Sequence, residues 1–267
     1  MDKKAISKDR RVYLRKQKMN KIAILTVQIL IVVGFIALWE ILANLGVIDS
    51  FIASQPSRIL KTFMNLSSNN LLTHLGVTCF ETIVGFGLGA ILGILIAIIL
   101  WWSNFLSKVA DPFLVVLNSL PKIALGPVII IWVGAGMGAI IVMALAISLI
   151  VTVLEILNGF LNTDKELLKM ARTFNASKIQ VLTKIVIPAN ISTFINSLKV
   201  NIGLSLVGVI SGEFLVSKAG LGYLIVYGGQ VFQLDLVMTS VIILSIVAAI
   251  MYQGVVLLGK LVQKEQK

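Results

Sequence analysis

The chain has 267 residues, of which 58% are hydrophobic and 13% are charged, and its mean hydropathy is +0.99. A soluble domain carries roughly 25% charged residues, so this composition excludes a soluble globular protein. A single cysteine, with 5 Pro and 21 Gly that follow no triplet period, excludes a disulfide scaffold and a collagen-like chain. A polytopic membrane protein remains. At roughly 20 residues per helical span, the length allows about six or seven spans.

The net charge of +11 is concentrated at the N-terminus, where nine of the 23 Lys and Arg residues lie within the first 21 positions. A nucleic-acid-binding protein would also be basic. However, a basic flank directly before an apolar run is typical of a cytoplasmic segment ahead of a membrane span. The apolar run 22–47 is too long for the apolar region of a signal peptide. We therefore interpret it as an uncleaved first span after a basic cytoplasmic segment, residues 1–21, and expect no nucleic-acid partner.

The apolar runs along the whole chain predict six membrane-spanning helices. They are expected at about residues 22–45, 75–102, 112–133, 139–160, 188–216 and 236–258. A loop at 103–111 is expected before the third span, and a long polar segment follows the fourth. The sequence therefore predicts an all-α membrane protein with a transmembrane domain over residues 22–258 and a cytoplasmic tail over residues 259–267.

The distribution of basic residues supports this topology. With the N-terminus inside, the cytoplasmic segments hold 18 Lys and Arg residues, and the outer loops hold only Arg58, Lys61 and Lys218. Such an asymmetry is typical of cytoplasmic loops. Six spans place both termini on the cytoplasmic side, and long apolar runs without alternation exclude a β-barrel. We expect a multi-pass protein of the cytoplasmic membrane, embedded in the lipid bilayer.

Two of the predicted spans carry unusual residues. Gly85, Gly89 and Gly93 leave one face of the second span nearly free of side chains, which allows either close internal packing or a subunit interface. Pro121 and Pro127 each remove a backbone donor from the third span. They predict either a kinked structural helix or a broken helix along a transport pathway. Lys122 would either contact an anionic substrate or extend its ammonium group to the membrane surface.

Neither a catalytic constellation nor a metal-binding cluster is present in the sequence. The lone histidine is His74, and no phosphate-binding loop occurs. An intramembrane enzyme is therefore disfavoured, and energy for transport must come from an ion gradient or from another polypeptide. Carboxylates within or at the ends of apolar spans would suit a proton-coupled secondary transporter; these are Glu40, Glu81, Glu155 and Glu213. No internal repeat of the kind such carriers often have is evident.

The polar segment 161–188 contains two short helical patterns on either side of Asn175. We expect Thr163 to cap the first helix, with Glu166 three residues later. Asparagine tolerates a left-handed backbone at a helix end, and the second helix is expected to begin near Ser177. A basic helix-turn-helix on the membrane surface suits docking to a cytoplasmic partner, and attraction of a solvated basic loop to anionic lipid is the alternative.

Residues 169–177, Lys-Met-Ala-Arg-Thr-Phe-Asn-Ala-Ser, are followed by Ile-Val-Ile-Pro at 185–188. This segment resembles the EAA loop of bacterial ABC importer permeases, which reads E-A-A, three residues, G, nine residues, I-x-L-P. Lysine replaces the glutamate, asparagine the glycine and isoleucine the leucine, but the spacing is kept. The resemblance implies that this segment couples the membrane domain to an ATPase. The residues it marks are Glu166, Lys169, Ala171, Arg172, Asn175, Ala176, Ile185 and Pro188.

Further motifs extend the resemblance over residues 74–258. The stretches 74–86, 120–134 and 212–225 look like those of permeases for nitrate, sulfonates, taurine and related small nutrients. The resemblance implies the type I ABC importer permease fold. It also implies two copies of the permease, two cytoplasmic ATPase subunits that use ATP and Mg²⁺, and an external substrate-binding protein. This chain itself is expected to bind no cofactor. Candidate residues of the pathway are Pro121, Lys122, Pro127 and Glu213.

Overall fold

The computed structural model describes residues 8–64 and 70–264, and within these ranges the regular structure is entirely helical. Five helices in the described ranges are long and apolar enough to cross a membrane. A sixth crossing results when a pair of shorter helices with a sharp bend between them is counted as one span. The chain divides into two compact units, residues 1–64 and residues 65–267. Of the basic residues used to predict the topology, Lys3, Lys4 and Lys267 lie outside the described residues.

The first unit contains three helices: α1 (Lys8–Asn44), α2 (Ser50–Ala53) and α3 (Pro56–Met64). Most of the basic segment and the first predicted span thus form one continuous helix. The side chain of Asp49 caps α2 by accepting a hydrogen bond from the backbone N–H of Phe51. The backbone N–H of Ser57 donates to Oε2 of Glu40 over 3.0 Å, which ties the start of α3 to the end of α1.

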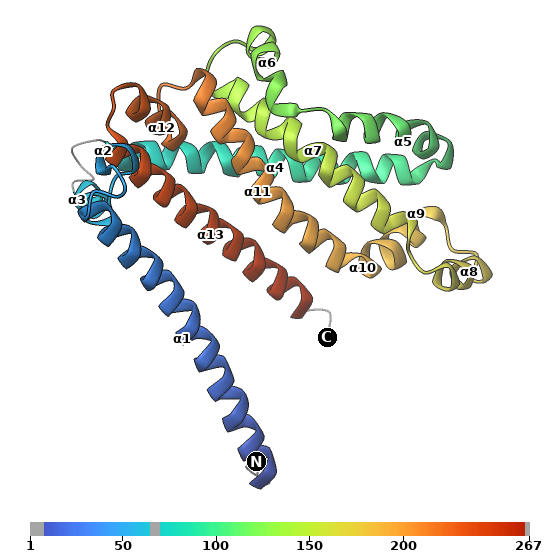
Figure 1. Cartoon of the computed structure of the whole chain (residues 1–267). Helices are drawn as coiled ribbons and strands as arrows, with labels where there is room; N and C mark the ends of the chain where they lie inside the picture. The colour runs from blue at the N-terminus through green and yellow to red at the C-terminus, as the bar shows by residue number, and fades with distance from the viewer. Residues whose placement is uncertain (1–7, 65–69, 265–267) are drawn as a thin grey trace. The chain divides into compact units, whose positions relative to one another are not determined.

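The second unit is built on four long helices: α4 (Leu71–Trp102), α7 (Met137–Leu161), α11 (Ile191–Val216) and α13 (Leu234–Lys264). Shorter elements connect them: α5 (Asn104–Ser119), the 3-10 turn η1 (Lys122–Leu125), α6 (Gly126–Val133), α8 (Lys165–Thr173), α9 (Lys178–Val181), the π-helical turn η2 (Leu182–Val186), α10 (Ile187–Ala189) and α12 (Leu221–Gln230). Helices α4, α7 and α11 pack against one another, and α13 packs on α11 and α12 (Figure 1).

The glycine face of α4 packs against α7. A methyl group at Gly85, Gly89 or Gly93 would lie 2.7 Å or less from a side-chain atom of α7. The facing residues are Ala144, Ser148 and Thr152, which recur every four positions and form one ridge. Lipid tails are as apolar as the helix surfaces, so helices in a membrane associate through close van der Waals packing and interhelical hydrogen bonds. Of the two interpretations of this face, the structure thus supports internal packing.

We expect replacement of Gly85 by leucine to destabilise the second unit. The new Cβ would meet the Cβ of Ala144, which no rotamer change can move aside. Overpacking of this kind costs about 1–3 kcal/mol, so the unfolding temperature of the detergent-solubilised protein should fall by several degrees. Gly87→Leu is the matched control, because a Cβ there has no neighbour within 4 Å. Equal unfolding temperatures for the two variants would contradict this packing.

The third predicted span is broken, and the predicted loop before it is wrong. Helix α5 begins at Asn104, because Ser103 caps it by accepting from the N–H of Leu106. The axis then bends by 86° between the α5 segment and the η1–α6 segment. Pro121 and Pro127 lie on either side of η1 and lack the N–H groups that a continuous helix needs. The alternative of a merely kinked helix is therefore excluded.

Helices α4 and α13 extend beyond the predicted spans. Helix α4 begins at Leu71, and α13 continues to Lys264, so most of the predicted tail is helical. An apolar run marks only the part of a helix that crosses hydrocarbon, and lysine and glutamine are themselves good helix formers. The boundaries drawn from hydropathy are therefore shorter than the helices.

Polar side chains join α7 and α11 inside the second unit. The Asn201 Nδ2 group donates to Oγ1 of Thr152 over 2.7 Å, and both residues are buried.

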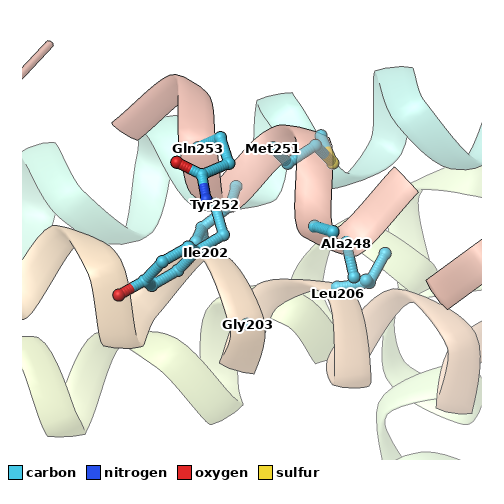
Figure 2. Close-up of a pocket in the computed structure, with 8 residues that line it drawn as sticks. Ile202, Gly203, Leu206, Ala248, Met251, Tyr252 and Gln253 are labelled. Atoms are coloured by element: carbon cyan, nitrogen blue, oxygen red, sulfur yellow. The ribbon is translucent and has the colours of Figure 1, made fainter. Parts of the chain in front are cut away.

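Helices α11 and α13 line a cavity of about 350 Å³. It is mostly apolar, with the phenol of Tyr252 and the amide of Gln253 at one end (Figure 2). None of the four predicted pathway residues lines this cavity.

Candidate coupling segment and pathway residues

Helix α8 begins one residue later than predicted. Its cap is Asp164, whose side chain accepts a hydrogen bond of 2.8 Å from the N–H of Glu166. The prediction that Thr163 caps this helix is wrong. Thr163 is buried, and its hydroxyl accepts from the amide of Asn190 over 2.9 Å and donates back to the carbonyl of Gly159. Thr163 therefore fixes the segment to the start of α11.

The turn after α8 is built on Asn175, whose φ of 53° lies in the left-handed region. The N–H of Asn175 donates to the carbonyl of Arg172, and the N–H of Ala176 donates to that of Ala171, each over 3.0 Å. These two bonds define a Schellman motif, the common helix end with a left-handed residue, usually glycine. The expectation that Asn175 adopts a left-handed backbone at the end of this helix is confirmed.

Helix α9 carries a cap that sequence reasoning missed. Ser177 and Gln180 form a capping box, in which each side chain bonds the backbone N–H of the other residue. The spacing Ser-x-x-Gln was the available signal. The second predicted helix is also less regular than expected, because α9 gives way to η2 and then to α10, which contains Pro188.

The segment has a buried side and an exposed side. Ala171 is buried, and Leu182 and Val186 pack with Ile156 and Phe160 near the end of α7. On the other side, the side chain of Phe174 is 79% exposed at the tip of the turn. Sequence reasoning missed Phe174 as a candidate site residue, although a phenylalanine beside a predicted tight turn in a polar segment was a usable signal.

The predicted coupling residues fall into two groups. Ala171, Arg172, Asn175 and Ala176 share the end of α8 and its turn, and Glu166 and Lys169 are exposed on the same helix. Ile185 and Pro188 lie further along, on η2 and α10. Lys178 connects the segment to α4, since its ammonium group hydrogen-bonds the carbonyl of Trp102 and lies 5.3 Å from the centre of that indole ring.

The structure does not bring the four pathway candidates together. Pro121 and Pro127 lie at the break between α5 and α6, and between them Lys122 donates from Nζ to the carbonyl of Asn118 over 2.8 Å. Glu213 is buried near the end of α11 with 1% of its surface exposed, and its side chain bonds Thr78 and Gly222. Their role in transport stays a prediction.

Glu213 belongs to a polar cluster that holds the start of α12. Its Oε1 accepts from the hydroxyl of Thr78 over 2.7 Å, and its Oε2 accepts from the N–H of Gly222 over 2.5 Å. The Thr78 hydroxyl accepts from the N–H of Leu221 over 2.8 Å. The N–H of Gly220 donates to Nδ1 of His74 over 2.9 Å. The N–H groups at a helix start lack intrahelical partners, and here side chains of α4 and α11 supply them.

Two further carboxyl groups are partly unsatisfied within the described residues. Glu81 is buried beside Glu213, and its Oε2 has no hydrogen-bond partner there. Oε2 of Glu155, on α7, is likewise buried without one. The roles of both residues stay open. His74, which the sequence marked as the lone histidine, stacks on Tyr223 with the ring centres 5.7 Å apart and holds α12 in place.

Comparison with known proteins identifies the family. Residues 89–265 match the model of the binding-protein-dependent transport system inner membrane component. A probable ABC transporter permease protein of Haemophilus influenzae is 30% identical over 84% of this chain and 91% of its own length. The putative aliphatic sulfonates transport permease SsuC of Bacillus subtilis is 29% identical over 79% of this chain and 77% of its own. The chain belongs to this family of inner membrane components.

A solved structure supports the fold. A chain in an inward-facing structure of the MetNI methionine ABC transporter superposes with a TM-score of 0.62 at 18% identity, covering 74% of this chain and 96% of that one. The all-α type I ABC importer permease fold is thereby confirmed. The protein is a permease subunit of an ABC importer and a multi-pass component of the cytoplasmic membrane. Nothing in these comparisons supports an ion-gradient-driven secondary transporter.

Proposed function

We propose that two copies of this chain form the translocation pathway of an ABC importer, with two cytoplasmic ATPase subunits and an external substrate-binding protein. Both termini and the segment 161–188 face the cytoplasm in this assembly. The observation that carries the proposal is the α8–α9 turn, which presents an exposed aromatic side chain at its tip and packs its other side on the membrane helices. The permease family supplies the context.

The packing of this segment suits the transmission of motion. On the tip side, Phe174 and its neighbours are free to enter a groove on an ATPase. On the membrane side, Leu182 and Val186 lie in the same apolar cluster as residues from the end of α7 and Ala97 of α4. Because close-packed interiors transmit displacement rather than absorb it, closure of the ATPases would move the ends of the long helices. The pathway would then open alternately to the two sides of the membrane, which is the alternating-access mechanism.

The transported substrate is proposed from the named relatives. Among them are permeases for aliphatic sulfonates, taurine and formylaminopyrimidine. We propose a small nutrient of the nitrate, sulfonate, taurine or vitamin-precursor class, delivered by the external binding protein. Pro121, Lys122, Pro127 and Glu213 are the proposed pathway residues. This chain needs no cofactor of its own, since the partner ATPase uses ATP and Mg²⁺.

The energy source separates this proposal from a carrier. In vesicles that contain the complete importer, we expect uptake of the substrate to require internal ATP and to persist when an uncoupler collapses the proton gradient. The reason is that hydrolysis on the ATPases, and not ion movement, drives the conformational cycle. Radiolabelled uptake, with and without ATP and uncoupler, measures this directly. Uptake driven by an imposed proton or sodium gradient without ATP would reject the proposal.

A further inference from the structure

A second cavity lies where the coupling segment meets the membrane helices. It has a volume of about 470 Å³. Its walls come from the end of α4 and the first turn of α5, from the end of α7, and from α8 and α9. Its lining residues are Trp101, Asn104, Ser107, Leu161, Leu168, Arg172, Ala176, Lys178 and Val181. Elements distant in sequence therefore build it together.

The polar lining of this cavity suits an anion. Two cations, Arg172 and Lys178, line it together with the amide of Asn104 and the hydroxyl of Ser107, and no carboxylate is among the lining residues. Lys178 is held in place by its contacts with the backbone and ring of Trp102. Within the described parts of the chain, hydrogen bonds are not formed by the side chains of Asn104, Ser107 and Arg172. Ser107 is nevertheless only 6% exposed.

The position of the cavity favours a lipid over a soluble ligand. Trp101 and Leu161 end the apolar spans α4 and α7, so the cavity lies at the level where hydrocarbon gives way to headgroups. Tryptophan at the end of a span is typical of this interface. The apolar wall of Leu161, Leu168 and Val181 would adjoin the glycerol and upper acyl region of a lipid, and the two cations would face its phosphate. Basic pockets between helix ends bind lipid headgroups in this way.

We propose that this cavity binds the phosphate group of an anionic phospholipid headgroup, with Arg172 and Lys178 as its cationic ligands and Asn104 and Ser107 as neutral donors. The site lies between the coupling segment and the ends of α4 and α7, so a bound lipid would join these elements. This inference is independent of the transported substrate. It also differs from diffuse attraction of basic residues to a charged surface, because it requires particular side chains.

The test is lipid retention by the purified full-length chain. Native mass spectrometry counts phosphatidylglycerol and phosphatidylcholine bound to the wild type and to Arg172→Gln/Lys178→Gln. We expect preferential retention of phosphatidylglycerol by the wild type and a loss of about tenfold in the double variant. Lys169→Gln/Lys184→Gln is the matched control, because it removes the same charge from the same segment outside the cavity. Asn104→Trp keeps every charge and should also lower retention by filling the cavity.

Several results would overturn the proposal. Equal losses in the control and the cavity variant would show attraction to the general surface charge only. Retention of phosphatidylcholine as strongly as phosphatidylglycerol would show that the cavity does not select an anionic headgroup. Binding of inorganic phosphate alone, with displacement of the lipid at millimolar concentration, would assign the cavity to a free anion. If the wild-type chain alone retained no lipid, the cavity would not be a lipid site, and contact with the ATPase would be the remaining role for it. Unfolding temperatures equal to the wild type confirm that the variants are folded.

Discussion

Valine in place of Asn175 is expected to uncouple transport from ATP hydrolysis. Asn175 has a φ of 53°, and a left-handed backbone costs a residue with a Cβ roughly 1–2 kcal/mol, more for a β-branched one. This strain is enough to reduce the population of the native turn by about tenfold. The two hydrogen bonds from Asn175 and Ala176 that close the end of α8 would be lost with it, and so would the position of Phe174 at the tip.

The matched variant is Asn175→Gly, because glycine adopts this backbone without penalty. We expect the glycine variant to retain transport and ATPase association, and the valine variant to lose about tenfold in both. Co-purification of the ATPase and substrate-stimulated ATP hydrolysis give the two readouts. Because the turn is exposed and outside the apolar spans, both variants should insert in the membrane normally. Normal transport by the valine variant would show that this turn is not the coupling element.

Removal of the Glu213 carboxylate is expected to loosen the start of α12. In Glu213→Ala the N–H of Gly222 loses the carboxylate oxygen that accepts its hydrogen bond in a buried site, whereas the Thr78 hydroxyl can turn to the carbonyl of His74, 3.2 Å away. An unsatisfied buried donor costs about 1–3 kcal/mol. We expect a lower unfolding temperature and faster hydrogen exchange at the backbone amides of residues 220–222, measured by mass spectrometry.

Three further variants serve as controls for this experiment. Glu213→Gln keeps an oxygen that can accept from Gly222 and should retain most of the protection. Lys218→Ala changes an exposed residue of the same loop and should leave exchange at α12 unchanged. Gly220→Ala should also reduce the protection of these amides from exchange. A methyl group at Gly220, which has a φ of 119°, would overlap the Glu213 carboxyl and displace it. Lost transport with unaltered exchange in Glu213→Ala would favour a direct role in the pathway instead.

Hydropathy and charge were sufficient to predict the class of fold and the six apolar runs, because the cost of polar groups in hydrocarbon constrains every span. Asn175 could be predicted because its conformation depends on local backbone sterics alone. Thr163 was misassigned because its hydroxyl is used by Asn190, 27 residues later in the chain. A contact of this kind has no local signature. The α12 cluster was missed for the same reason, since Thr78 and Leu221 meet only in the folded unit.

The break at Pro121 shows the limit of a residue-based prediction. The prolines indicated that the third span could not be regular, but they could not decide between a kink and an 86° bend. That choice depends on what packs beside them. A methyl group at Gly126 would overlap Leu215, so α6 lies directly against the end of α11. Tertiary packing therefore decides where the chain goes once its helical hydrogen bonds are interrupted.

The π-helical turn η2, which lies between α9 and α10 within the coupling segment, shifts the phase of the helical faces. In η2 the N–H of Ile187 reaches back five residues to the carbonyl of Leu182, one more than in an α-helix. One extra residue in a turn rotates everything before it by about 100° relative to everything after it. A helical wheel drawn through residues 178–216 as one α-helix would therefore place the α9 side chains on the wrong face. Deleting one residue from η2 would bring the two halves into register and turn the tip of the coupling segment away from its present direction.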